Sequence, residues 1–77
     1  MKVKIYGTSW CTFCQQAKTL CESKSLSYEY IDVDDTSNLR DLEQKIGQKV
    51  KSVPQIFIDD KFIPGGYSGF SKEISNA

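Results

Sequence analysis

Two cysteines three positions apart, Cys11 and Cys14, carry the clearest chemical signal in this 77-residue sequence. A Cys-x-x-Cys pair either exchanges thiols and disulfides or supplies thiolates to a metal ion. A structural zinc site needs four ligands, and the sequence offers only one more cysteine, Cys21, and no histidine. The pair therefore favours redox chemistry over zinc binding.

The pair falls where a strand-like segment gives way to a helical one. Residues 2–6 alternate polar and apolar side chains and predict a strand, whereas residues 12–24 show helical spacing. The first N–H groups of a helix lack partners within it, and its dipole is positive there, so a thiolate at this place is stabilised. We expect Cys11 to be the solvent-exposed nucleophile, and Cys14, one turn further in, to be the more buried resolving thiol.

The elements that would position this pair follow from the rest of the pattern. Asp34 and Asp35 offer a turn and a helix cap, and Cys21 is expected to be a small core residue. The predicted strands span 27–33, 55–58 and 61–63, and the predicted helices span 38–46 and 68–76. The order βαβαββα predicts an α/β fold, with a four-stranded mixed sheet flanked by three helices.

A second motif, Ser52-Val53-Pro54, precedes the predicted strand at 55–58. Proline is unusual at the start of a strand inside a sheet. A cis Val53–Pro54 bond would explain it, because the chain would turn sharply and expose the Val53 backbone. Those backbone groups could then pair with an extended peptide as an added strand. An ordinary trans proline at a strand start is the alternative.

The third motif, Gly65-Gly66-Tyr67-Ser68, lies just before the last predicted helix. Two glycines before a helix can form a backbone nest that accepts a carboxylate. A plain Gly-Gly turn would have the same sequence, so this motif gains weight only in company with the other two.

Composition limits the partners. Acidic and basic residues number ten each, which gives no electrostatic footprint for nucleic acid or an anionic membrane. No apolar run approaches the ~20 residues of a membrane helix, and no signal peptide is evident. An odd cysteine count argues against a secreted disulfide scaffold and predicts a cytoplasmic protein. A chain this short has room for one domain, so a substrate is expected in a shallow surface groove.

In their order and spacing the three motifs resemble the glutaredoxin family over nearly the whole chain. The resemblance implies a single glutaredoxin domain over residues 1–77, with a thioredoxin fold. It implies a monomeric enzyme that reduces protein disulfides and glutathione mixed disulfides, with glutathione as the electron source. No metal or organic cofactor is required for that cycle.

The resemblance also assigns roles to residues. Cys11 becomes the nucleophile and Cys14 the resolving thiol. The residues implied to bind glutathione are Phe13, Lys51, Val53, Pro54, Gly66, Tyr67 and Ser68.

Two departures from the family pattern raise alternatives. Thr12 stands where the family usually has proline, and Thr8 where it often has lysine. Some members without that proline, including ones with tryptophan directly before the pair as in Trp10-Cys11, bind a [2Fe–2S] cluster between two subunits. Cys11 and glutathione would then be the cluster ligands. The triplet at 68–70 also resembles redoxins that thioredoxin reductase reduces and that donate electrons to ribonucleotide reductase.

Overall fold

The computed structural model describes residues 1–76, which form a four-stranded sheet and three helices. In chain order the elements are β1 (Lys2–Gly7), α1 (Thr12–Ser23), β2 (Ser27–Asp32), α2 (Thr36–Ile46), β3 (Gln55–Ile58), β4 (Lys61–Ile63) and α3 (Gly66–Ser75). The predicted order is therefore confirmed. Within these residues, no helix combines the length and apolar character needed to cross a bilayer.

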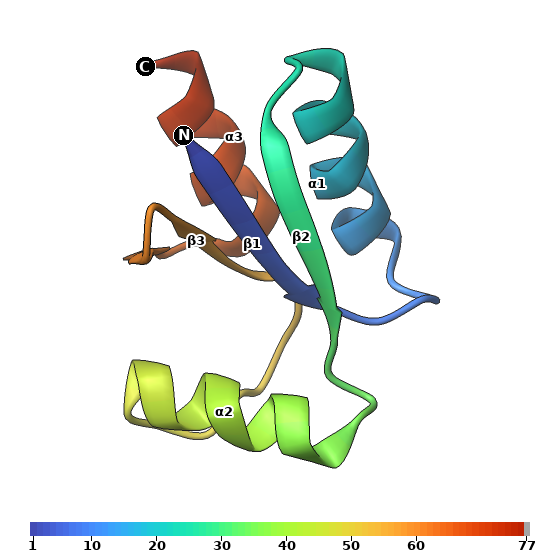
Figure 1. The fold of residues 1–77 in the computed structure, drawn as a ribbon, viewed down its shortest axis with the longest axis vertical. Helices are drawn as coiled ribbons and strands as arrows, with labels where there is room; N and C mark the ends of the chain where they lie inside the picture. The colour runs from blue at the N-terminus through green and yellow to red at the C-terminus, as the bar shows by residue number, and fades with distance from the viewer. Residues whose placement is uncertain (77) are drawn as a thin grey trace.

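The sheet is mixed, as predicted, with the strand order β2-β1-β3-β4. β1 pairs in parallel with β2, and β3 pairs antiparallel with both β1 and β4. In Figure 1, α1 and α3 lie side by side and α2 lies apart from them, toward the other end of the view. The helices thus cover the two faces of the sheet unequally.

Each face of the sheet has its own apolar core. The larger core lies under α1 and α3 and consists of Val3, Ile5, Ala17, Cys21, Ile56, Ile58, Ile63, Phe70 and Ile74. The smaller core lies under α2 and consists of Tyr6, Val33, Leu42 and Phe57. Alternation along the strands produces this division, because successive strand residues point to opposite faces.

Two helices begin earlier than the sequence predicts. α2 starts at Thr36 rather than at 38, because the Asp35 carboxylate accepts the Ser37 N–H at 2.9 Å and its hydroxyl at 2.6 Å. α3 starts at Gly66 rather than at 68, because Gly65 takes a left-handed conformation with φ 93° and serves as the N-cap. The predicted strand at 27–33 ends one residue early, at Asp32.

The strand register brings distant loops together. Tyr6, near the end of β1, pairs with Gln55, the first residue of β3. The chain leaves β1 toward α1 and enters β3 from the loop that contains Pro54. The end of β1 and the start of β3 therefore lie side by side at the same end of the sheet, and there the Cys11 thiol contacts the Val53 carbonyl oxygen.

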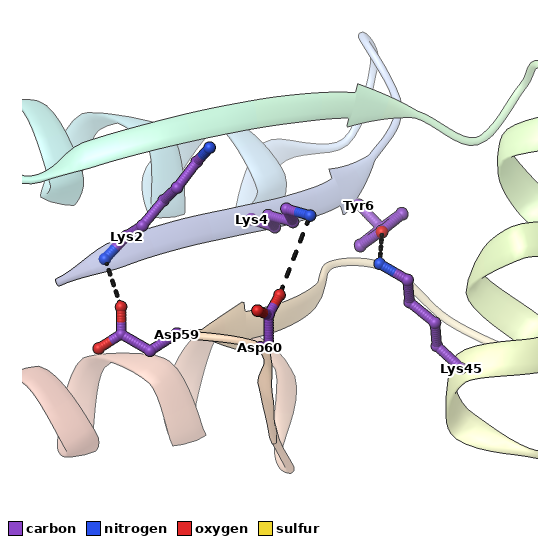
Figure 2. Close-up of polar contacts among 6 residues, drawn as sticks. All are labelled: Lys2, Lys4, Tyr6, Lys45, Asp59 and Asp60. Atoms are coloured by element: carbon purple, nitrogen blue, oxygen red, sulfur yellow. Dashed lines mark hydrogen bonds and ion pairs between the residues drawn. The ribbon is translucent and has the colours of Figure 1, made fainter.

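Polar contacts join β1 to the β3–β4 turn and to α2, as Figure 2 shows. The Lys2 backbone N–H donates to Asp59 at 2.8 Å, and the Lys4 ammonium lies 4.0 Å from Asp60. On the other side, the Lys45 ammonium donates to the Tyr6 hydroxyl at 3.1 Å, which ties α2 to β1. Such exposed ion pairs contribute little to stability, so packing dominates.

Candidate active site

Cys11 is the N-cap residue of α1, with an extended backbone at φ −84° and ψ 116°. Its sulfur accepts the backbone N–H of Cys14 at 3.2 Å, in the manner of a capping side chain. The sulfur thus receives one of the unpaired donors of the first turn and lies at the positive end of the helix dipole. Cys11 thus lies at the helix start, as the sequence predicts.

The expectation that Cys11 would be well exposed is wrong. The residue is only 9% exposed, because its thiol lies 3.8 Å from the Val53 carbonyl oxygen, to which it donates. The expected ranking of the two cysteines is confirmed, since Cys14 is 0% exposed. Trp10 and Phe13, by contrast, are 73% and 57% exposed beside the pair. Most of the Cys11 side chain is therefore covered, and a small part of it stays accessible.

A groove of about 330 Å³ gathers most of the residues that the family resemblance implies. Its lining consists of Phe13, Ser52, Val53, Pro54, Gln55, Gly65, Gly66, Tyr67 and Ser68. The rings of Phe13 and Tyr67 stack across it, with 6.1 Å between their centroids. Lys51 lines an adjoining groove, which shares Ser52 and Gln55 with this one, and is not part of the first lining.

Three of the lining residues, Ser52, Gln55 and Gly65, were not among the predicted site residues. Ser52 and Gly65 belong to the second and third sequence motifs, and Gln55 directly follows the second, so their places in the chain were the available signal. Ser52 and Gln55 flank the Val53-Pro54 pair, and Gly65 precedes Gly66.

The two backbone features predicted for this groove are present. The Val53–Pro54 peptide bond is cis. Gly65 and Gly66 both have positive φ, at 93° and 59°, where other residues are strained. At the start of α3 the N–H groups of Gly66, Tyr67 and Ser68 have no carbonyl partner within the helix, so they can receive an anion.

The two other thiols are buried and neutral at pH 7. Burial raises the pKa of Cys14 to about 11, and its contact with the Cys11 thiol adds to this, while the Thr8 backbone and the Tyr30 hydroxyl oppose it. Burial likewise raises the pKa of Cys21 to about 11. Cys21 is 0% exposed in the larger core, which confirms its predicted packing role.

Comparison with known proteins agrees with this geometry. A sequence profile described as Glutaredoxin matches residues 3–63. Glutaredoxin 1 of Escherichia coli is 40% identical to this chain in an alignment 77 positions long, which covers 92% of this chain and 89% of that protein.

Solved structures give the same result. Reduced E. coli glutaredoxin superposes with a TM-score of 0.81 at 36% identity, covering 99% of this chain and 95% of that one. A buckwheat glutaredoxin–glutathione complex superposes with a TM-score of 0.75 at 26% identity, covering 96% of this chain and 68% of that one. The chain therefore belongs to the glutaredoxin family of thiol–disulfide oxidoreductases and has their thioredoxin-like fold.

Proposed function

We propose that this glutaredoxin reduces protein disulfides and glutathione mixed disulfides, with Cys11 as nucleophile, Cys14 as resolving thiol and glutathione as reductant. The observation that supports this most directly is the place of the Cys11 sulfur. It caps α1, lies 3.8 Å from the Val53 carbonyl and adjoins the groove lined by Phe13, Val53 and Tyr67.

In this proposal Cys11 attacks one sulfur of the substrate disulfide. That disulfide breaks, its other sulfur leaves and takes up a proton, and a Cys11–substrate disulfide remains. Cys14 then attacks the Cys11 sulfur, which forms the Cys11–Cys14 disulfide and releases the second substrate thiol. Two electrons have moved from the pair to the substrate. Two glutathione molecules, oxidised to their disulfide, return the pair to thiols.

The groove supplies a binding mode for glutathione. Glutathione's cysteinyl backbone would pair with Val53, as an added strand does. Its γ-glutamyl carboxylate would lie at the N–H groups of Tyr67 and Ser68, with the Ser68 hydroxyl helping, and Phe13 would pack beside it. Pro54 and Gly66 complete this lining, and Lys51 in the adjoining groove is a candidate for a second carboxylate. A buckwheat glutaredoxin forms a complex with glutathione, which supports glutathione as the ligand of this chain.

The proposal extends to the setting of the protein. The whole chain acts as one domain, since α3 packs on the same core as the strands of the family match, and we propose that it works as a monomer. The cytoplasm is the proposed location, because the proposed cycle needs Cys11 and Cys14 returned to thiols, which a reducing compartment favours.

A coupled assay with glutathione, glutathione reductase and a glutathionylated small disulfide tests the roles. Cys11→Ser should lose all measurable turnover. Cys14→Ser should keep activity on glutathione mixed disulfides, because glutathione itself can resolve them, and should lose activity on protein disulfides. Cys21→Ala, a cysteine variant in the same helix, should behave as wild type. Turnover in Cys11→Ser would contradict the proposal.

The two alternatives from the sequence stay predictions. Among residues 1–76 there is no group of three or more Cys, His, Asp or Glu side chains placed to hold a metal. A [2Fe–2S] cluster on Cys11 would therefore need thiolates from glutathione and a second subunit. Visible absorption after anaerobic purification would reveal it. Turnover with thioredoxin reductase in the absence of glutathione would favour the redoxin that feeds ribonucleotide reductase.

A further inference from the structure

We infer that the Tyr30 hydroxyl is a positioning group for the resolving step, set beside Cys14 to stabilise its sulfur as the proton leaves. This inference rests on the proposed function, since it needs Cys14 to act as the resolving thiol. Tyr30 lies in β2, outside all three sequence motifs.

Hydrogen bonds hold the Tyr30 hydroxyl at one place. It donates to the Thr8 carbonyl oxygen at 2.6 Å and accepts from the Gln15 side-chain amide at 3.4 Å. Thr8 belongs to the loop that leads to Cys11, and Gln15 follows Cys14 in α1. The hydroxyl therefore joins the strand, the loop and the helix around the cysteine pair.

The space around Gly7 shows how close the hydroxyl is to the sulfur. A Cβ placed on Gly7 would lie 2.6 Å from the Cys14 sulfur and 2.8 Å from the Tyr30 hydroxyl oxygen. The Cys14 sulfur and the Tyr30 hydroxyl oxygen therefore both lie against Gly7, and they can do so only because residue 7 has no side chain. Cys14 is 0% exposed, so water does not solvate its sulfur there.

The attack of Cys14 on the mixed disulfide requires a hydrogen-bond donor near its sulfur, and the Tyr30 hydroxyl is placed to be that donor. As Cys14 attacks the Cys11 sulfur, its proton passes to the leaving substrate sulfur, and negative charge appears on a buried atom. A buried charge is costly without a hydrogen-bond donor. The Tyr30 hydroxyl can supply that donor if its hydrogen turns about the C–O bond, away from the Thr8 carbonyl oxygen and toward the Cys14 sulfur. The electrostatics agree, because this hydroxyl lowers the pKa of Cys14 against the effect of burial.

The ionisable groups around the Tyr30 hydroxyl keep it protonated. Burial and the thiols of Cys14 and Cys11, with a contribution from Asp32, raise the pKa of Tyr30 well above its usual value. The hydroxyl therefore stays protonated throughout the working pH range and remains a donor. Thr8, whose carbonyl oxygen accepts from Tyr30, has a buried side-chain hydroxyl with no hydrogen-bond partner among residues 1–76.

The test is Tyr30→Phe, with Tyr28→Phe as the matched control. Tyr28 lies two residues earlier on the same strand, and its hydroxyl donates to Glu22 at 2.7 Å. Reduced protein is mixed with excess glutathione disulfide, quenched with acid and alkylated. Mass spectrometry then separates the Cys11 mixed disulfide from the Cys11–Cys14 disulfide. Fluorescence of Trp10, the one tryptophan, follows the same reaction continuously.

Tyr30→Phe should slow conversion of the mixed disulfide to the intramolecular disulfide by about tenfold, as expected for a lost hydrogen bond to a charged group. The rate–pH profile of that step should move to higher pH, and formation of the mixed disulfide should be unchanged. Tyr28→Phe should match wild type. In a Cys14→Ser background, Tyr30→Phe should leave glutathione-dependent turnover unaltered.

Conversion at the wild-type rate in Tyr30→Phe would overturn the inference. So would an equal loss of turnover in the Cys14→Ser background, because the hydroxyl would then act on the fold or on Cys11. Failure of the proposed function gives a different result. In that case wild-type protein forms no mixed disulfide on Cys11, or Cys11→Ser stays active, whatever residue 30 is.

Discussion

The three cysteines show how environment separates residues of one type. Cys11 caps a helix next to a groove, whereas Cys14 and Cys21 are fully buried. Burial raises the pKa of both buried thiols to about 11. Cys14 is still within reach of Cys11, since its N–H donates to the Cys11 sulfur, and Cys21 packs in the core. Only position relative to Cys11 distinguishes a resolving thiol from a packing one.

The buried thiols predict a loss of stability at alkaline pH. Their pKa in the folded chain, about 11, lies above the ordinary value of 9.0, so the native state holds these protons more tightly than the unfolded chain. The resulting stability is complete below pH 9 and is lost as pH rises toward 11.

Each thiol should contribute a slope of about 1.4 kcal/mol per pH unit within that window. Urea unfolding of wild type and Cys21→Ala from pH 7 to 11 measures it, because every other titration is common to both proteins. Cys21→Ala should lose stability less steeply above pH 9. Parallel curves would show that the Cys21 thiol ionises equally in the folded and unfolded chains.

At the scale of elements, the three helices have N-cap residues of different types, and these types suit different roles. Asp35 caps α2 with its carboxylate, which is an ordinary stabilising cap. The N-cap residues of α1 and α3 are instead Cys11 and Gly65, and neither of them has a carboxylate side chain. Leaving these two starts without an acidic side chain keeps the positive ends of both helices available to a thiolate and to an anionic ligand.

The start of α3 depends on close packing at Gly69. A Cβ on this residue would overlap the Pro64 carbonyl oxygen, which belongs to the turn before the helix. Alanine normally stabilises a helix relative to glycine by up to ~1 kcal/mol. Here the overlap should reverse the sign, and Gly69→Ala should destabilise the fold by about 2 kcal/mol.

Urea unfolding measures that loss, and Ser71→Ala in the same helix is the control, with no loss expected. Since the turn also precedes Gly66, glutathione should bind more weakly to Gly69→Ala. A gain of stability in Gly69→Ala would refute the packing argument.

In the whole molecule, the two faces of the sheet are covered by different helices, and the groove involves only two of the three helices. The groove is built by residues of α1 and α3 and by the loop before β3, whereas α2 packs on a smaller core. Leu42 is the fully buried side chain of α2, at 0% exposure. The helix with the fewest buried apolar side chains should therefore open most easily.

Leu42→Ala should destabilise the protein by about 3 kcal/mol, as other core leucine truncations do. Amide hydrogen exchange should quicken first in α2, over residues Thr36–Ile46, while the amides of β1 and β3 keep most of their protection. Leu39→Ala, a partly buried neighbour, should cost less. Uniform loss of protection across the sheet would mean that α2 does not open on its own.

The sequence by itself determined the local features. The Cys-x-x-Cys pair at a helix start, the element order and the turn at Asp59-Asp60 all follow from spacing and propensity within about ten residues. The sequence pointed to a cis Val53–Pro54 bond but left an ordinary trans proline open, and the structure has the cis bond.

Only the tertiary structure decided what surrounds the cysteines. The Val53 carbonyl lies over Cys11, and the Tyr30 hydroxyl lies beside Cys14, because β1 pairs with β3 on one side and β2 on the other. Strand pairing joins residues far apart in the chain, and local periodicity contains no record of it. That is why the low exposure of Cys11 and the place of Tyr30 could not be anticipated.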